Sequence, residues 1–306
     1  MVDPDLLHFL LEIPTAREEL KSYRDKNGAN ILIGVIASDI GQRDKVTLAT
    51  AILKRDLVNL DDADDKKQTA LHKAVLYGLT DTVRELISLG ADPGLQDNDG
   101  CTPLMLTMDW RDLSEVKNRS RKTEVALATE LGKTKGNLNW NVKDKEGDTV
   151  LHIATHFDRT DLFQLYFKHH MPGDQDVLLI KDQAKHIPIE VAAGCGSRRV
   201  LKFLIRAGRC KGMEGIAAAH QAAAKFHASS LKMILADGVA KNASTPFKGA
   251  TLLTRLMSHL PIWTSQYKSF MSILQIVLNW GADPNFRCKC GKTVMHTLVY
   301  RYTSVK

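Results

Sequence analysis

The sequence predicts an all-α solenoid, in which short helix–turn–helix units stack in chain order. Similar segments begin at Asp64 and Asp97, which lie 33 residues apart. Apolar residues at helical spacing follow each start, as in residues 83–87. A glycine then follows, such as Gly90, which ends a helix in the left-handed conformation without steric cost. Two helices this short cannot bury their own apolar faces, so neighbouring units must stack.

A four-residue motif marks the first helix of each unit. It reads Thr69-Ala70-Leu71-His72 in one unit and Thr102-Pro103-Leu104-Met105 in the next. A T-P-L-H motif within a 33-residue unit is typical of the ankyrin repeat, which this chain resembles. The threonine is expected to cap the helix through its hydroxyl, and proline is tolerated at the first helical position. The expected caps are Thr69, Thr102, Thr149, Thr251 and Thr293, and the expected helix-opening prolines are Pro103 and Pro188.

Spacing from these motifs divides the chain into an N-terminal capping helix, residues 1–24, and a repeat domain, residues 25–306. Leu6, Leu7, Leu10 and Leu11 form the apolar stripe of the cap. Each repeat is expected to open with a short β-turn loop, called a finger below. A basic insertion at about 109–122 is expected to form a loop before a helix over residues 123–131. The seven to eight repeats start near residues 25, 64, 97, 144, 182, 212, 246 and 288.

Composition narrows the functional classes. The chain is 44% hydrophobic and 25% charged, which is ordinary for a globular protein. No apolar run reaches the roughly 18 residues that span a membrane, and the acidic N-terminus is unlike a signal peptide. Five cysteines without framework spacing favour reduced thiols, in cytoplasm and/or nucleus. The net charge of +7 is compatible with an acidic partner, but no nucleic-acid motif is present. We therefore expect no membrane and no direct sequence-specific nucleic-acid binding.

Three motifs that could carry chemistry are incomplete. Gly132-Lys133-Thr134 resembles the end of a phosphate loop, but Leu127 stands where that loop needs glycine. Cys288, Cys290 and His296 supply only three of the four ligands of a structural zinc site. The acidic run at residues 61–65 lacks the glycine and distal glutamate of a calcium loop. We expect no catalytic residue, no cofactor and no metal, and predict that the protein is not an enzyme.

Histidine recurs at one place in four repeats. Repetition makes catalysis an unsatisfactory explanation, whereas a buried turn histidine that hydrogen-bonds backbone groups explains all of them together. These residues are His72, His152, His220 and His296.

A more specific resemblance begins at residue 144. Residues 144–154 read D-K-E-G-D-T-V-L-H-I-A, which resembles the first repeat of the inhibitor-of-NF-kappaB (IkappaB) family. Three later features resemble the nuclear, atypical branch of that family. They are a longer connection, a degenerate second motif at residues 187–190 and a late insertion at 259–268. Residues 144–300 carry this resemblance, which covers about half of the chain.

The resemblance implies a partner and a contact surface. The solenoid would dock a Rel-type transcription-factor dimer and modulate transcription in immune-type signalling. Candidate contact residues on the fingers are Lys145, Glu146, Asp182, Gln183, Lys185, Lys289 and Lys292. A separate basic group comprises Lys117, Arg119, Arg121 and Lys122. It is either a nuclear-import signal, a phosphate contact or a solvated loop.

Two other functions stay open at this point. One is a substrate adaptor for a ubiquitin ligase, although such chains add a C-terminal box and only about ten residues follow His296. The other is a host-directed effector with an activity in residues 109–143, where no nucleophile and base can be singled out.

Overall fold

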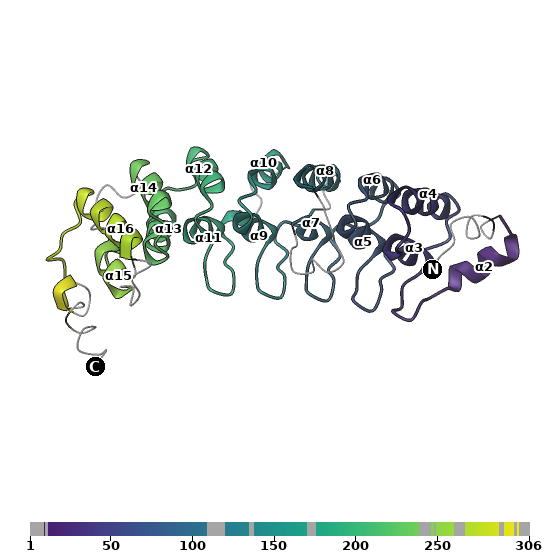
Figure 1. Ribbon diagram of the computed structural model, residues 1–306, viewed down its shortest axis with the longest axis horizontal. Helices are drawn as coiled ribbons and strands as arrows, with labels where there is room; N and C mark the ends of the chain where they lie inside the picture. The colour runs from purple at the N-terminus through teal and green to yellow at the C-terminus, as the bar shows by residue number, and fades with distance from the viewer. Residues whose placement is uncertain are drawn as a thin grey trace. The chain divides into compact units, whose positions relative to one another are not determined.

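The computed structural model describes residues 9, 12–108, 120–134, 138–169, 176–238, 246, 247, 249–259, 267–287, 291–296 and 299. Regular structure in these residues is helical, so the predicted all-α class is confirmed (Figure 1). The chain divides into two compact units. One comprises Met1–Val150 with Gln164–Asp174, and the other comprises Leu151–Phe163 with Gln175–Lys306.

Among the described residues, the first unit contains one terminal helix and three helix pairs. First helices pack on first helices, α3 on α5 and α5 on α7, and second helices pack in the same way, α4 on α6 and α6 on α8. This produces the two helical layers seen in Figure 1. The helices are α2 (Pro14–Ser22), α3 (Ile31–Ala37), α4 (Gln42–Leu53), α5 (Ala70–Leu76), α6 (Thr80–Ser88), α7 (Pro103–Leu106) and α8 (Arg121–Leu131).

The second unit repeats this arrangement. First helices α11, α13 and α15 pack in sequence, and so do second helices α12, α14 and α16. Helices α9 and α10 each contribute residues to both units. The elements are α9 (Val150–His156), α10 (Thr160–His169), the 3-10 helix η1 (Val177–Leu179), α11 (Pro188–Cys195), α12 (Arg198–Arg206), α13 (Gly212–Ala224), α14 (Ala228–Ala236), α15 (Leu252–Ser258) and α16 (Tyr267–Asn279).

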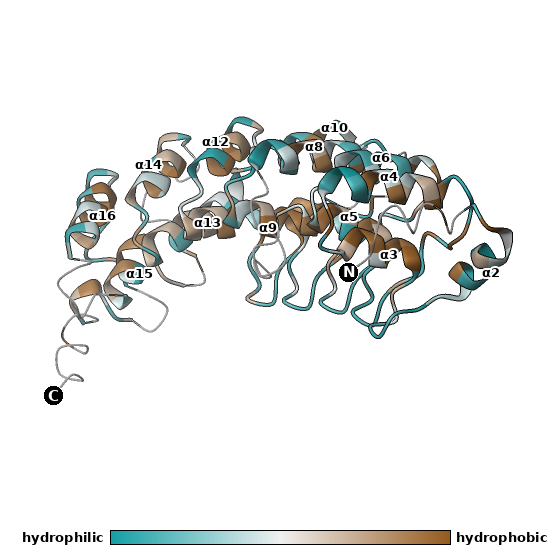
Figure 2. Cartoon of the chain, turned by 45° about the vertical axis from the view of Figure 1, so that its right-hand side comes forward, coloured by the Kyte–Doolittle hydropathy of each residue, from teal (hydrophilic) through white to brown (hydrophobic). Residues whose placement is uncertain are grey.

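The core runs between the two helical layers of each unit. Hydrophobic residues dominate the facing surfaces of these helices, whereas the fingers are hydrophilic (Figure 2). Every residue of α5 is buried, because α3 and α7 cover it from both sides. Burying one large aliphatic side chain contributes roughly 1.5–3 kcal/mol, so stacking supplies the stability that a single repeat lacks.

Two predicted threonine caps and both predicted helix-opening prolines are confirmed. The Thr69 hydroxyl accepts a hydrogen bond from the backbone N–H of His72, and Thr251 does the same for Thr254. Pro103 and Pro188 open their helices as predicted. The prediction is wrong for Thr102, whose side chain makes no capping hydrogen bond. Pro103 occupies the first turn of α7 and has no N–H, so this helix start has one donor fewer to satisfy.

Two predicted boundaries shift, and the glycine ends are confirmed. Helix α8 begins at Arg121, so Arg121 and Lys122 lie in its first turn and not in a loop. Helix α13 begins at Gly212, where a finger was expected. The glycines that follow α6, α12, α14 and α16 have left-handed backbone: Gly90 at φ +96°, Gly208 at +70°, Gly238 at +74° and Gly281 at +80°.

Candidate protein-interaction surface

One aspartate closes each finger. The N–H of Asp64 donates to the carbonyl of Gln68 at 3.1 Å. Its Oδ1 accepts from the N–H groups of Lys66 and Gln68, at 3.0 and 2.8 Å. The same side-chain closure recurs in the fingers that begin at Asp25, Asp97, Asp144 and Asp182. Because a short side chain satisfies the backbone locally, each finger keeps a defined shape.

The fourth residue of every finger has left-handed backbone. It is glycine in three of these fingers, Gly28, Gly100 and Gly147, with φ of +73°, +75° and +77°. Lys67 and Lys185 hold the same position, with φ of +57° and +65°. A lysine Cβ makes this conformation costlier than glycine does.

Backbone hydrogen bonds join the four fingers of the first unit. The Asn27 carbonyl accepts from Asp65 N–H at 2.8 Å. The Lys66 carbonyl accepts from Asn98 N–H at 2.8 Å, and the Asp99 carbonyl accepts from Lys145 N–H at 2.9 Å. We call this series the finger ladder. Backbone atoms form the ladder, and it holds the fingers in one row (Figure 1). The residue types at the fingertips can therefore differ without breaking it.

The tips of these fingers are polar and carry both signs of charge. Lys145 and Asp99 form a solvent-exposed ion pair between Nζ and Oδ1 at 3.6 Å. Such a pair contributes little to stability, so both groups are available to a partner at small cost. The exposed tip residues are Lys26, Asn27, Asp65, Lys66, Asn98, Asp99, Lys145 and Glu146.

The structure places most of the predicted contact residues at the surface. Lys145, Glu146, Gln183, Lys185 and Lys292 are exposed. Asp182 is half-buried, because its carboxylate closes its own finger. Lys289 lies outside the described residues.

Only part of the predicted basic group can be located. Arg121 and Lys122 are exposed on the first turn of α8. Lys117 and Arg119 lie outside the described residues.

The glycine of the apparent phosphate motif has a packing role. Gly132 follows the C-terminal end of α8, whereas a phosphate loop precedes a helix N-terminus. A Cβ built on Gly132 would lie 2.5 Å from Leu165 Cδ1, so a larger residue here would require the Leu165 side chain of α10 to move. The Thr134 hydroxyl donates to the Leu131 carbonyl at 2.7 Å, which completes the helix end.

The motif histidine joins one repeat to the next. His72 Nε2 lies 3.2 Å from the Cys101 carbonyl oxygen, which can only accept, so Nε2 carries the proton. Nδ1 then accepts from Thr69 N–H at 3.2 Å. Burial disfavours the imidazolium and lowers the pKa of His72 below its ordinary value, although Cys101, Asp97 and Asp64 oppose this shift.

The predicted burial of these histidines is confirmed at three positions. His72, His152 and His220 are buried, and His152 Nε2 lies 3.1 Å from the His186 carbonyl oxygen. The prediction is wrong for His296, which is exposed. Its Nδ1 still lies 2.8 Å from the Thr293 hydroxyl, so the local turn forms without burial.

The acidic groups near the fingers have structural uses. Asp61 Oδ1 accepts from Asp92 N–H at 3.0 Å, and Asp62 pairs with Arg24 at 2.6 Å. Asp144, Glu146 and Asp148 place carboxylate oxygens within 4.8 Å of one another. Asp144 already accepts two finger N–H groups, so this cluster needs no ion to explain it.

One buried ion pair was not expected from the sequence. Lys73 in α5 reaches Asp64, and the two side chains are 7% and 6% exposed. The signal that could have revealed it is a lysine on an otherwise apolar first helix, nine residues after the finger aspartate.

Among the described residues, no helix combines the length and the apolar character that crossing a membrane requires.

Part of the chain matches a known repeat family and several known proteins. Residues 52–106 match the family described as ankyrin repeats (many copies). Over 95 residues the chain is 34% identical to inversin of Homo sapiens and to the B-cell lymphoma 3 protein homolog of Mus musculus. Each match covers 31% of this chain, but only 8% and 19% of those proteins.

A solved structure extends the similarity along the chain. The ankyrin repeat domain of Bcl-3, described as a unique member of the IkappaB protein family, aligns with a TM-score of 0.58. The alignment covers 75% of this chain and 93% of that domain, at 17% sequence identity. At this identity the similarity establishes the fold, which is the ankyrin-repeat fold.

Proposed function

We propose that this ankyrin-repeat protein is a non-enzymatic scaffold that binds a Rel-type transcription-factor dimer through its fingers and modulates transcription. The finger ladder is the observation that carries the proposal. Its backbone hydrogen bonds, from Asn27–Asp65 to Asp99–Lys145, fix a row of exposed side chains before any partner arrives. A surface ordered in advance loses little conformational entropy on binding, which favours affinity.

The chemistry of the fingertips favours a folded protein as the partner. The first fingertip carries a lysine, the third carries an aspartate, and the second and fourth each carry one cation and one anion, so both signs of charge occur along the row. Complementary charges across an interface give specificity and fix register. A polyanion such as nucleic acid would instead require charge of one sign along its track.

Similarity to Bcl-3 is what supports the Rel-type partner in particular. We propose that the protein acts in the cytoplasm and/or nucleus. The proposed contact residues are Lys145 and Glu146 on the last rung of the ladder, Gln183 and Lys185 on the Asp182 finger, and Lys292 in the last repeat. All five are exposed, so substitution alters the surface and spares the core.

Affinity purification of the full chain from cells tests the proposal. We expect a Rel-type factor to co-purify, and the double charge reversal Lys145→Glu/Lys185→Glu to reduce its recovery at least tenfold. Lys232→Glu is the control, because Lys232 is also exposed but lies on the second helix α14. Absence of a Rel-type factor, or recovery unaffected by the double reversal, would refute this function.

A further inference from the structure

The repeat that begins at Gly212 has no finger. Helix α12 ends at Arg206 and α13 begins at Gly212, so residues 207–211 connect the helices directly. Helix α13 is 13 residues long, compared with seven for α5. Its first residues therefore form helix where the repeats that begin at Asp25, Asp64, Asp97, Asp144 and Asp182 form a finger (Figure 1).

The missing finger leaves the edge of the preceding finger open. In the finger ladder, the carbonyl of the third finger residue accepts an N–H from the next finger, as Lys66 accepts from Asn98. Ala184 is the third residue of the Asp182 finger. Ala184 is exposed, and its carbonyl accepts no hydrogen bond from any described residue. The Ala184 carbonyl, which would accept the next hydrogen bond of the pattern, can therefore accept an N–H from a ligand.

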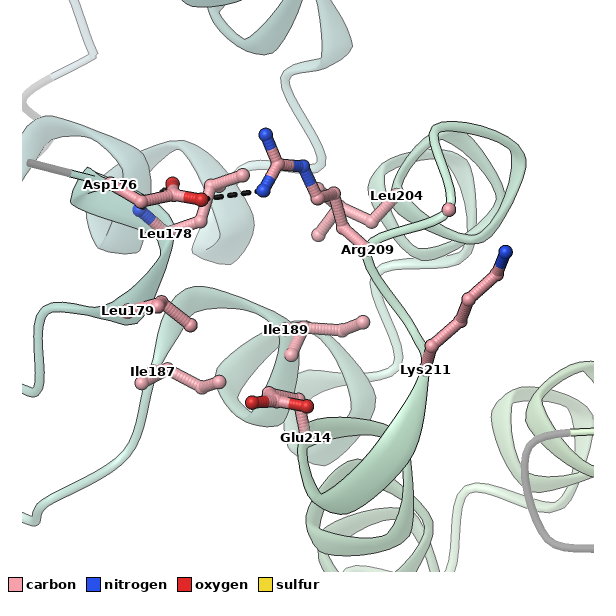
Figure 3. Close-up of a pocket in the computed structure, with 10 residues that line it drawn as sticks. Asp176, Leu178, Leu179, Ile187, Ile189, Leu204, Arg209, Lys211 and Glu214 are labelled. Atoms are coloured by element: carbon pink, nitrogen blue, oxygen red, sulfur yellow. Dashed lines mark hydrogen bonds and ion pairs between the residues drawn. The ribbon is translucent and has the colours of Figure 1, made fainter. Parts of the chain in front are cut away.

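A cavity of about 230 Å³ lies at the base of this same finger. Aliphatic side chains form much of its wall, and they project from η1, α11 and α12 (Figure 3). Its apolar lining comprises Leu178, Leu179, Ile187, Ile189 and Leu204.

Charged groups surround the apolar lining. Asp176 and Arg209 pair at 2.5 Å and close one end of the cavity (Figure 3). Glu214, from the first turn of α13, and Lys211 complete the charged lining. Lys211 is exposed and forms no ion pair within the described residues. A ligand here would meet a wall of aliphatic groups with a free cation beside it.

We propose that an extended segment of a partner protein occupies the place of the missing finger. One N–H of the segment donates to the Ala184 carbonyl, an aliphatic side chain enters the cavity, and a carboxylate pairs with Lys211. Addition of an extended peptide to an open backbone edge, with pockets for its side chains, is an established mode of recognition. The site needs no Rel-type partner, so it stands independently of the function proposed above.

The geometry sets the spacing within that segment. Ala184 and Ile187 are three residues apart, which corresponds to at most about 10 Å of extended chain. A bound extended segment advances about 3.3 Å per residue. The donating N–H and the aliphatic side chain should therefore lie about two or three residues apart.

Selection from a phage-displayed library of random dodecapeptides on the full chain tests the proposal. We expect enriched peptides to share an aliphatic residue beside an aspartate or glutamate. Leu179→Asp should weaken their binding about tenfold or more, because the cavity wall then carries a charge. Leu179 is 55% exposed, so the variant should fold, and Leu89→Asp at 52% exposure in the first unit is the matched control.

N-methylation of the selected peptide, one residue at a time, tests the backbone bond. Binding should be lost at one position, two or three residues from the aliphatic side chain, and Lys211→Glu should weaken binding several-fold. Failure to enrich any peptide, equal binding to Leu179→Asp and wild type, or tolerance of N-methylation throughout would each overturn the proposal. Concentration-dependent dimerisation that Leu179→Asp abolishes would also overturn it, because a second copy would then be the occupant.

Discussion

Lys73 Nζ lies 3.1 Å from Asp64 Oδ2, and both side chains are almost completely buried. Asp64 closes its finger through Oδ1, so the same carboxylate joins the finger to α5. The residues nine positions after Asp97 and Asp144 are Leu106 and Ile153, so those repeats have an aliphatic side chain where this one has a cation. The repeat at Asp64 thus substitutes an ion pair for a packing contact.

Breaking this pair should be costly. Lys73→Met leaves the Asp64 carboxylate buried without its cation, and we expect the free energy of unfolding to fall by about 3 kcal/mol. Adding Asp64→Asn removes the unpaired charge and keeps an oxygen that can accept the finger N–H groups. The double variant should therefore recover part of the loss. Urea denaturation followed by circular dichroism measures both.

The exposed Lys54→Met serves as the control for this experiment, and it should change stability by less than about 0.5 kcal/mol. If Lys73→Met behaved like Lys54→Met, the buried pair would have no stabilising role.

A substitution to glycine usually destabilises a fold. At the fourth finger residue, where the backbone is left-handed, we expect glycine to be stabilising. Lys67→Gly should stabilise the fold by about 0.5 kcal/mol, because relief at φ +57° exceeds the entropy that glycine adds to the unfolded chain. Lys66→Gly, one residue earlier, has no such relief and should destabilise. Thermal unfolding of the two variants distinguishes these effects, and a loss of stability in Lys67→Gly would contradict the first.

Gly100→Ala tests the same position in the next finger. Its φ is +75°, and an added Cβ would lie 3.0 Å from Asp144 Cα, which belongs to backbone and cannot rotate away. We expect a loss of about 1–2 kcal/mol from backbone strain, with a further contribution from the contact. Gly90→Ala has a similar φ of +96° and no neighbour within 4 Å, so it measures the strain alone. Equal losses in the two variants would show that the steric contact is unimportant.

His72 should make stability depend on pH. Burial lowers its pKa in the folded state, so the unfolded chain binds a proton first as the pH falls below about 6.5. The contribution of neutral His72 to the free energy of unfolding is complete above that pH. It is lost progressively below it, at no more than about 1.4 kcal/mol per pH unit. His72→Gln can keep a donor and an acceptor without titrating. Its free energy of unfolding should therefore fall less between pH 7 and pH 5, and parallel curves would exclude His72 as the cause.

The described cysteines should differ in reactivity. Cys101 and Cys210 are buried, and burial raises the pKa of the Cys210 thiol to about 12. Cys195 is exposed at the end of α11. Iodoacetamide at pH 8 should alkylate Cys195 before Cys101 and Cys210, because the thiolate is the reactive species and burial hinders its formation. Peptide mapping by mass spectrometry follows each site, and Cys210 should react only after unfolding. Rapid alkylation of Cys210 in the folded chain would contradict its burial.

Much of the candidate surface was predictable because its determinants are local. The finger aspartates and the glycine at position four could be found by counting from Asp64, since a turn is specified by residues close together in the chain. The surface position of Lys145 and Lys185 followed from the same count. The departure at Gly212 could not be found in this way. Glycines at 212 and 215 disfavour a helix locally, and packing of α13 against α11 offsets that cost.

The sequence by itself determined the period, the helix ends and the alternation of apolar and polar faces. These depend on side chains within a few residues of one another, so helical spacing, threonine caps and left-handed glycines suffice to specify them. Only the tertiary structure decided the finger ladder, the Asp64–Lys73 pair and the open edge at Ala184. Each depends on which atoms of one repeat meet the next, and that is decided by how the helices pack.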